Sequence, residues 1–514
     1  MAEPDIASFS KELIDAVKEG RVKDRDSLQN LKLKLCKRYG LGEVPPNSDV
    51  LANVLLEDRK LLIPFLVKKP TRTISGVAVV AVMTSPHDCP HGRCAFCPGG
   101  VGNNSPQSYT GKEPAARRAG RNHFDPWMQV TDRITQLSEI GHKTDKIDLI
   151  VMGGTFTSRE PEYQEWFVRR CFDALNGRDS ETLEEAQKLN EVSEHRCVGL
   201  TVETRPDVFT PEQIDRVMRL GATRVELGVQ ILDDDVLRGV DRGHGISEVR
   251  ECTRNCRDRG LKVCYHMMPG LPGSSPDNDL KCFKRVFEDP DFRPDMLKFY
   301  PVLVVAGTKL YDMWEAGNYH PYLEEDAVPL LSEMKAAVPE YVRIQRIQRD
   351  IPVTEISAGI HKSNIRQLVG DYMQKNGMEC RCIRCREVGH RGTVLSDPDR
   401  VVLKDTVYEA SGGTEHFIAL EYEDSLIGYV RLRLDSNPVA TIRELKVFGK
   451  VASIGDEGED WQHRGYGRKL VSEAERIAAE AGRKGIRVTS GVGVRGYYRS
   501  LGFREGLPYM VKDL

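Results

Sequence analysis

Two groups of cysteines carry the clearest chemical signal in the sequence. Cys89, Cys94 and Cys97 are spaced Cys-x4-Cys-x2-Cys in a loop rich in glycine and proline. Three thiolates on one loop can bind three irons of a cubane cluster and leave the fourth iron open to another ligand. Zinc is the alternative metal, and it needs a fourth protein donor, which His87 or His91 can supply.

The second group lies on a polar connector farther along the chain. Cys380, Cys382 and Cys385 fall within six positions, and His390 follows five residues later. This density indicates a metal site, and we expect a structural zinc ion with His390 as the nearest fourth ligand. An auxiliary iron–sulfur cluster is the competing interpretation.

Polar residues also stand at the ends of apolar segments that read as strands. Gly153-Gly154-Thr155 follows the apolar run 147–152, Glu203 follows a second run, and Gln230 follows a third. Strand ends of a parallel sheet meet at one edge, so these groups are expected to share one mouth. Glu203 could instead pair with the neighbouring Arg205.

The cysteine loop, with Phe96 before its last cysteine and glycines after it, resembles the radical S-adenosylmethionine superfamily. The usual spacing there is Cys-x3-Cys-x2-Cys, so this loop is one residue longer. The resemblance implies a [4Fe–4S] cluster and S-adenosylmethionine. It also implies that the glycine turn at Gly153 and Gly154 binds the methionine amino group of S-adenosylmethionine.

The glycine-containing segment Gln462-His463-Arg464-Gly465-Tyr466-Gly467 opens a long helix near the C-terminus. Glycines at a helix start let backbone N–H groups approach a pyrophosphate, where the helix dipole favours anions. The segment, between two strands, resembles the Gcn5-related acetyltransferase family and implies acetyl-coenzyme A. Tyr498 is implied as the contact to the coenzyme A sulfur, although a Tyr-Tyr pair also suits a core. The other implied cofactor-binding residues are Glu444, Leu445, Lys446, Val447, Gln462, Gly465, Tyr466, Gly467 and Arg468.

The elements that position these groups follow from the hydrophobic pattern. Short apolar runs alternate with amphipathic helices from residue 74, which predicts βα units and a parallel sheet. After residue 396 four consecutive antiparallel strands are expected, and a long helix then follows. The fold class is therefore α/β: a partial (β/α) TIM-like barrel and then an acetyltransferase-type α/β domain. The expected divisions are 1–73 (helical and basic), 74–375 (barrel), 376–395 (metal-binding linker) and 396–514 (acetyl-coenzyme A binding).

Composition limits the classes of function. The 514 residues carry a net charge of −3, which excludes a bulk polycation and requires any nucleic-acid surface to be a local patch. The basic N-terminal helices are either such a patch or a solvated face. Thirteen cysteines, an odd number, argue against a disulfide framework. The sequence shows neither a membrane-spanning run nor a signal peptide, so a cytoplasmic location is expected.

Motif by motif, the chain resembles the catalytic third subunit of Elongator. The stretches that carry this resemblance are Ser108-Tyr109-Thr110-Gly111, Ile150 to Phe156, Glu203 to Asp207 and Arg349-Asp350-Ile351-Pro352. It implies formation of 5-carboxymethyluridine at the wobble uridine of tRNA, from acetyl-coenzyme A and a 5′-deoxyadenosyl radical. Lys146 is implied as a coenzyme A-contacting, catalytic residue. The implied partners are the tRNA anticodon loop and an external electron donor, and a homodimer is compatible with the sequence.

The tRNA would need a basic track on the enzyme. Single-stranded RNA bases can be splayed into a pocket, while the phosphates contact Lys and Arg. Besides the N-terminal lysines, the expected contributors are Arg117, Arg118, Arg121, Arg343, Arg346 and Arg349.

Two other functions compete with this hypothesis. One is a protein lysine acetyltransferase whose iron–sulfur domain is structural, and the other is a non-catalytic RNA-binding scaffold. Cys89, Cys94, Cys97 and Glu203 together are what a working radical site requires, which argues against both. Turnover of S-adenosylmethionine would exclude the scaffold.

Overall fold

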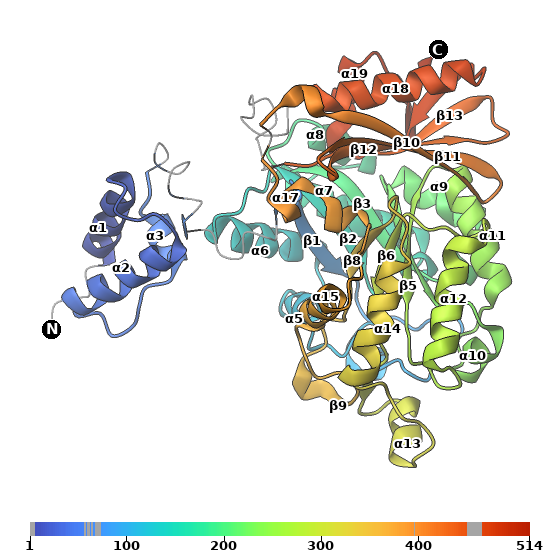
Figure 1. The fold of residues 1–514 in the computed structure, drawn as a ribbon, viewed down its shortest axis with the longest axis horizontal. Helices are drawn as coiled ribbons and strands as arrows, with labels where there is room; N and C mark the ends of the chain where they lie inside the picture. Colours follow the sequence, from blue (N-terminus) through green and yellow to red (C-terminus); the bar gives the residue numbers. More distant parts are fainter. Residues whose placement is uncertain are drawn as a thin grey trace.

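The computed structural model describes residues 6–55, 58, 62, 65–66, 73–394, 396–449 and 465–514. Figure 1 shows a small group of N-terminal helices, a central α/β barrel and a C-terminal sheet above it. Among the described residues, no helix combines the length and apolar character needed to cross a membrane.

The N-terminal helices form a unit with an apolar core of its own. They are α1 (Ile6–Lys18), α2 (Arg25–Arg38) and α3 (Asn47–Ala52). Asp24 caps α2 by accepting a hydrogen bond from the Ser27 N–H, at 2.7 Å. Phe9 and Leu35 are fully buried within this unit. The unit lies to one side of the barrel, where α3 meets α6 (Figure 1).

The barrel is an open, curled sheet with all strands parallel. Its strand order is β1-β2-β3-β4-β5-β6-β8, and within the described chain β1 and β8 are not paired with each other. The C-terminal strand ends form one mouth, and the N-terminal ends face the C-terminal sheet (Figure 1). The strands are β1 (Ala78–Met83), β2 (Lys146–Met152), β3 (Arg196–Thr204), β4 (Arg224–Gln230), β5 (Lys262–Met267), β6 (Met296–Phe299) and β8 (Arg343–Arg346).

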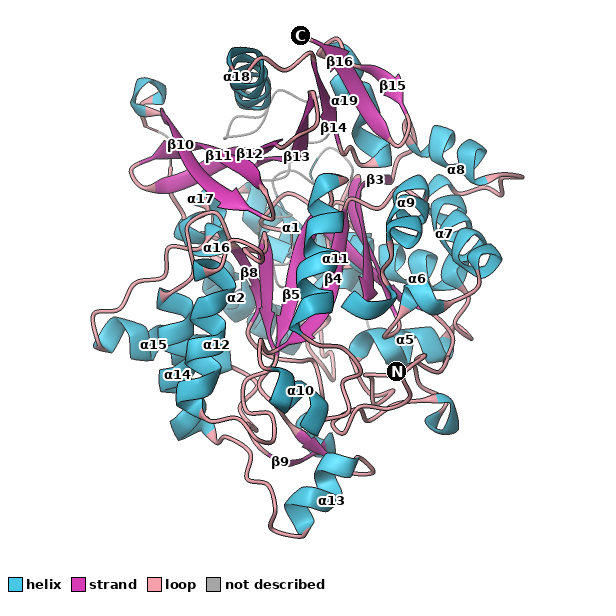
Figure 2. Cartoon of the chain, turned by 90° about the vertical axis from the view of Figure 1, so that its right-hand side faces the viewer, coloured by secondary structure: helices cyan, strands magenta, loops and turns pink. Residues whose placement is uncertain are grey.

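Helices cover the outer face of this sheet (Figure 2). Several begin with proline after a capping side chain, as α6 does after Asp125, because proline suits the first helical position. The helices are α5 (Pro114–Arg121), α6 (Pro126–Glu139), α7 (Pro161–Asn176), α8 (Leu183–Asn190), α9 (Pro211–Arg219), α10 (Asp234–Gly239), α11 (Ile246–Asp258), α12 (Pro276–Glu288), α13 (Lys309–Glu315), α14 (Glu324–Ala336) and α15 (Ile365–Lys375). A small antiparallel pair, β7 (Val304–Val305) and β9 (Ile356–Ala358), lies outside the main sheet.

The C-terminal sheet has the order β10-β11-β12-β13-β14-β16-β15. The first four strands are antiparallel neighbours, and β14 then pairs parallel to β13. Two short helices, α16 (Ile383–Arg386) and α17 (Val388–Arg391), connect it to the barrel. The remaining elements are β10 (Val402–Ala410), β11 (Gly413–Tyr422), β12 (Ser425–Leu434), β13 (Val439–Val447), α18 (Tyr466–Glu480), β14 (Gly485–Val488), α19 (Arg495–Ser500), β15 (Arg504–Gly506) and β16 (Tyr509–Asp513).

A buried cluster of ion pairs joins the barrel to the C-terminal sheet. Asp295, just before β6, accepts hydrogen bonds from both terminal nitrogens of Arg443 on β13, at 2.7 and 2.8 Å. Glu415 on β11 accepts from Arg443 and from Arg257 on α11. These four side chains are essentially inaccessible to solvent. The two sheets are therefore held together by charges that neither would bury alone.

The predicted fold class is confirmed, with differences in detail. The N-terminal region expected to be helical contains α1, α2 and the short α3, which ends at Ala52. The hydrophobic pattern misses strand β8 because Arg343-Ile344-Gln345-Arg346 has only one apolar residue. It also misses the closing strands β15 and β16, because both are short and lie at the chain end.

Candidate active site

The mouth of the barrel gathers the residues expected to bind an iron–sulfur cluster and its ligand. One cavity is lined by Cys89, Cys94, Cys97, Gly154, Thr155, Glu203 and Gln230, together with Tyr109, Arg205, His266, Tyr300 and Arg346. Gly153 has φ +143°, and a Cβ there would stand 2.1 Å from the Thr84 Oγ1. The turn after β2 therefore requires glycine at this position.

The three loop thiols are surrounded by hydrogen-bonding groups. The Ser108 N–H donates to the Cys97 Sγ at 3.1 Å, and the Cys89 Sγ lies 3.1 Å from the Thr155 hydroxyl. The Cys94 Sγ lies 3.1 Å from the His91 Nε2 and 3.5 Å from the Arg242 Nη1. Donors aimed at sulfur stabilise thiolates, which are the form that binds metal.

The spacing of these thiols distinguishes a cluster from a single ion. In the described chain, three donors that lie within 4.8 Å of one another occur at the second cysteine triplet but not in this loop. A single zinc ion needs its donors that close, whereas a cubane binds each thiolate at a different iron. The loop therefore fits an iron–sulfur cluster better than it fits zinc.

Glu203 and Gln230 end neighbouring strands of the mouth. The Tyr109 hydroxyl donates to the Glu203 Oε2 at 2.6 Å, and Arg205 pairs with Asp207 at 2.8 Å. The alternative pairing of Glu203 with Arg205 is thus not what the structure shows. Gln230 has φ +74°, and its Oε1 is buried without a hydrogen-bond partner. A strained backbone and an unpaired buried acceptor are features of ligand sites.

Sequence reasoning misses a group of three titratable residues at the mouth, two of which line its cavity. Glu226 on β4 accepts hydrogen bonds from Lys298 and, at 2.8 Å, from the His266 Nε2. Burial raises the pKa of Glu226, but Lys298 and His266 outweigh this effect and hold the pKa below its ordinary value. The signal that could have revealed these residues is a titratable side chain within each of three apolar strands, β4, β5 and β6.

A second cavity lies at the opposite end of the barrel, between its N-terminal strand ends and β13. Its wall includes Lys146 from β2 and the residues Glu444, Leu445, Lys446, Val447, Gly465, Tyr466, Gly467 and Arg468. The pairing of β13 with β14 ends at Ile442, before the segment 444–447 begins. The backbone of that segment can therefore pair with a ligand, as the splayed strand of the resemblance requires.

The charges around this second cavity are strongly coupled. Burial raises the pKa of Glu444, but Lys262, Arg431 and Lys446 lower it to about 2. Burial lowers the pKa of Lys146 and of Lys446. Glu444 is thus held as a carboxylate beside lysines whose burial disfavours their charged form.

The structure places Tyr497 on the wall of the second cavity, whereas Tyr498 is buried against Phe503. The expected role of Tyr498 at the coenzyme A sulfur stays a prediction. Gln462 lies outside the described residues.

A third cavity adjoins the barrel mouth and is strongly basic. Its wall contains Lys112, Arg117, Arg121, Arg346, Arg349 and Arg366. Arg346 and Arg349 also line the mouth, so the two cavities share part of their walls. Two of the arginines expected on an RNA track point into the protein instead: Arg118 donates to the Ala81 carbonyl, and Arg343 donates to Glu387.

Four protein-family models match successive parts of the chain. Residues 6–74 match the ELP3 N-terminal domain, and residues 83–283 match the Radical SAM superfamily. Residues 294–375 match the Radical_SAM C-terminal domain, and residues 389–503 match the Acetyltransferase (GNAT) family. These families imply a [4Fe–4S] cluster, S-adenosylmethionine and acetyl-coenzyme A.

Whole-chain relatives identify the family. A Methanocaldococcus infernus protein named tRNA uridine(34) acetyltransferase is 50% identical, with all of both chains aligned. Human Elongator complex protein 3 is 43% identical over 99% of this chain and 96% of its own. The chain belongs to the Elongator protein 3 family. A solved structure of the M. infernus Elp3 lacking its N-terminus superposes with a TM-score of 0.77, at 48% identity, over 86% of this chain and all of that one.

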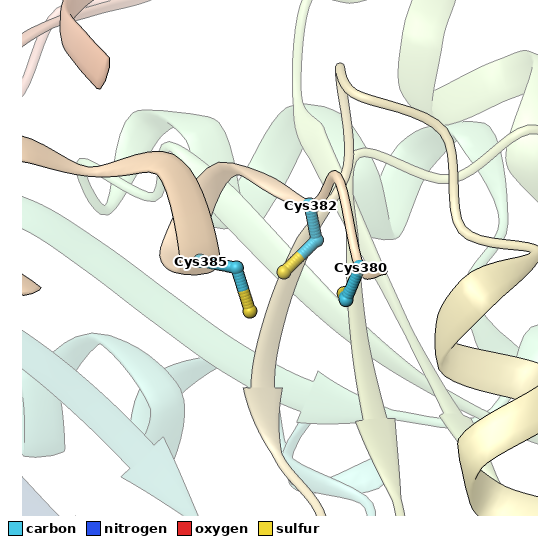
Figure 3. A group of neighbouring side chains, drawn as sticks. All are labelled: Cys380, Cys382 and Cys385. Carbon is cyan, nitrogen blue, oxygen red and sulfur yellow. The ribbon is translucent and has the colours of Figure 1, made fainter. Parts of the chain in front are cut away.

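The second cysteine triplet of this Elongator protein 3 family member has a compact geometry. Figure 3 shows the sulfurs of Cys380, Cys382 and Cys385 facing one another, and they lie within 4.8 Å. His390 is not within that distance of all three, although its Nε2 is buried without a hydrogen-bond partner. Burial, with Arg384 next, lowers the pKa of His390 to about 4. The side chain is thus neutral at pH 7, as a metal ligand must be.

Proposed function

We propose that this protein modifies the wobble uridine of tRNA, converting it to 5-carboxymethyluridine with acetyl-coenzyme A as the carbon source. One observation carries the proposal. A mouth built for an iron–sulfur cluster and a cavity built for acetyl-coenzyme A lie at the two ends of the same barrel. Relatives at 50% identity bear the name tRNA uridine(34) acetyltransferase, which supports the RNA substrate.

The side chains at the mouth bind and orient. Cys89, Cys94 and Cys97 would hold the cluster, and the turn at Gly153 and Gly154 leaves room for the amino acid end of S-adenosylmethionine. When bound, these groups supply hydrogen abstraction from an unactivated methyl group, which no side-chain base can deprotonate. The electron for this chemistry comes from an external donor.

The basic cavity beside the mouth binds the RNA. Lys112, Arg117 and Arg121 face it from one side, and residues 345–353 face it from the other. Phosphates of a single-stranded loop would lie along these cations, while the target base enters the mouth past Arg346 and Arg349. Tyr300 and the buried Met268 wall the mouth and exclude water.

Protein lysine acetylation is the alternative that the second cavity disfavours. The wall opposite the segment 444–447 consists of barrel residues, among them Asp148, Gly199 and Arg224. A lysine from another protein would have to reach an acetyl group that faces the barrel interior. The arrangement suits a donor whose acetyl group is used inside this chain.

We further assign structural zinc to Cys380, Cys382 and Cys385, with His390 as the fourth ligand. Their thiols have the separation that a single tetrahedral ion requires. The helices α16 and α17 that carry Cys385 and His390 pack against β12, and α16 also packs against β8. The ion would thereby fix the connector to both sheets.

The chain would act in the cytoplasm, which all thirteen unpaired cysteines support. A homodimer stays a prediction from the sequence.

The test is a reconstituted reaction. The full chain is loaded with iron and sulfide under anaerobic conditions and incubated with dithionite, S-adenosylmethionine, acetyl-coenzyme A and unmodified tRNA. Digested nucleosides are then analysed by mass spectrometry. We expect 5-carboxymethyluridine, and no product when S-adenosylmethionine is omitted. An intact cluster and bound tRNA without this product would overturn the proposal.

A further inference from the structure

The interior of the barrel contains charged and partly exposed residues. The inward-facing residues of a barrel of this type are usually branched apolar side chains that form a packed core. Here Lys146, Asp148, Ile150 and Met152 of β2 are all partly exposed, while the alternate residues of the strand are buried among the outer helices. Lys146 and Asp148 line the second cavity, which is called the lower cavity from here on, and Met152 lines the mouth. One face of β2 is thus accessible at both ends.

Strand β4 shows how closely the two cavities approach each other. Arg224 lines the lower cavity and Glu226 lines the mouth. These residues share one face of the strand, two positions apart, which corresponds to about 7 Å along it. The Arg224 Nε lies 3.9 Å from the Glu226 Oε1. A single layer of side chains therefore separates the cavities.

This layer contains polar atoms without hydrogen-bond partners. The Arg224 Nε, the Glu226 Oε1 and the Thr201 Oγ1 are buried and have none. All three residues are at most 7% exposed, and the strand register places Thr201 beside Arg224. Two of these atoms, the Arg224 Nε and the Glu226 Oε1, face each other at a distance too long for a hydrogen bond, so the layer has free donors and acceptors that a polar ligand can pair with.

We propose that the inner face of the barrel, from Lys146 to Met152 on β2, is a passage through which the acyl-bearing pantetheine arm of acetyl-coenzyme A reaches the barrel mouth. The proposal rests on the proposed function, because only that reaction brings the acetyl methyl group to the mouth.

The dimensions and chemistry of the passage fit this ligand. The seven residues of β2 span about 20 Å, a length that an extended pantetheine arm can cover. The arm is slender and carries two amides, which can satisfy the unpaired atoms of the layer. Gly199 lines the lower cavity without a side chain and leaves room beside Asp148. Arg224 can turn aside to Asp148, whose carboxylate already lies 3.2 Å from it.

The first test narrows the passage at its middle. Ile150 is partly exposed, stands between the two cavities and lines neither, so an Ile150→Phe change fills the passage without altering either binding site. Ile150→Val is the matched control because it leaves the passage at least as wide. Three quantities are measured for each variant: acetyl-coenzyme A binding by calorimetry, 5′-deoxyadenosine release, and 5-carboxymethyluridine in tRNA.

We expect Ile150→Phe to keep its cluster and to bind acetyl-coenzyme A like the wild type, and to lose acetyl-coenzyme A-dependent 5′-deoxyadenosine release and 5-carboxymethyluridine together, by on the order of 100-fold, as displaced reacting groups do. Ile150→Val keeps the product within about twofold. Unchanged product in Ile150→Phe would overturn the passage. Absence of product in the wild type would overturn the proposed function instead, so the two failures are distinguishable.

A second measurement does not depend on a variant. The structure of the full chain is determined with a thioether analogue of acetyl-coenzyme A, which cannot be hydrolysed. We expect the pantetheine arm of the analogue beside Ile150 and its acyl end at the mouth near Met152, with Arg224 turned toward Asp148. An acyl end that instead points away from the barrel, toward the Tyr498 side of the C-terminal sheet, would refute the passage.

Discussion

The ion-pair cluster between the two sheets makes a strong prediction for the change Asp295→Asn. Both oxygens of Asp295 accept hydrogen bonds: Oδ1 from the Arg443 Nη2 at 2.7 Å, and Oδ2 from the Arg443 Nη1 at 2.8 Å and the Val263 N–H at 2.9 Å. In either amide orientation, the asparagine NH₂ group would face a donor. The change therefore removes a charge and also creates a contact between donors.

The magnitude follows from burial. Asp295 has no solvent-accessible area, and Arg257 and Arg431 lie 3.8 and 3.5 Å from it. Removing one partner of a buried ion pair costs about 3–5 kcal/mol, because the other charge stays buried without compensation. We expect a loss of this size in the free energy of unfolding, measured by urea denaturation of the full chain.

Glu480→Gln on α18 is the control for this prediction. It removes a carboxylate from a solvent-exposed pair with Arg476, and such pairs contribute little to stability because water screens them. If Asp295→Asn changed the free energy of unfolding no more than Glu480→Gln does, the cluster would not hold the sheets together and the reasoning would be wrong.

The same carboxylate gives the pH dependence its sign. Burial raises the pKa of Asp295, but Arg443, Arg257 and Arg431 outweigh it, so the folded-state pKa is depressed. Its stabilisation is therefore fully present above the unfolded-state pKa of about 3.9 and is lost as the pH falls below that value. The acid limb of the stability curve should be shallower in Asp295→Asn, which unfolding at a series of pH values would show.

Three further outcomes are expected. Tyr109→Phe removes the hydroxyl that donates to Glu203. Because a hydrogen bond to a charged group contributes about 1.5–3 kcal/mol, S-adenosylmethionine binding should weaken roughly 10- to 100-fold. Calorimetry measures this binding, and an unchanged affinity would contradict a positioning role for Tyr109. Cys382→Ser should lose one bound zinc per chain in elemental analysis, whereas Cys282→Ser should keep it; retained zinc in Cys382→Ser would contradict the assignment. Replacing both Arg117 and Arg121 by alanine should weaken tRNA binding and reduce the slope of log affinity against log salt by about 0.7 for each phosphate that the variant no longer neutralises; an unchanged slope would place the RNA elsewhere.

Periodicity in the sequence predicted the elements that have a strong apolar pattern. The apolar run 147–152 differs from β2 by one residue, because the alternating burial of this strand leaves a signal within it. β8 lacks that signal, since Ile344 is its single apolar residue and its place in the sheet depends on pairing with β6. The sequence pattern thus predicts a strand well when the strand's own residues alternate between buried and exposed, and poorly when the strand forms only by pairing with a distant one.

The candidate site divides in the same way. The cysteine loop and the glycine turn are contiguous motifs, so their spacing was readable. The group of Glu226, His266 and Lys298 comes from three strands and depends on the barrel register, which spacing along the chain does not encode. Which of Tyr497 and Tyr498 faces the second cavity depends on the rotation of the short helix α19, and no sequence pattern fixes that rotation.

The separate core of the N-terminal helices has a consequence for how the molecule unfolds. These helices bury Phe9, Leu35 and their neighbours among themselves and touch the barrel mainly through α3 and α6. Local stability follows such contact boundaries, so the unit should open without the barrel opening. Its amide protons would then exchange with solvent as one cooperative group, earlier than those of β1–β6. A protease would release it first and leave the barrel and the C-terminal sheet as one resistant fragment.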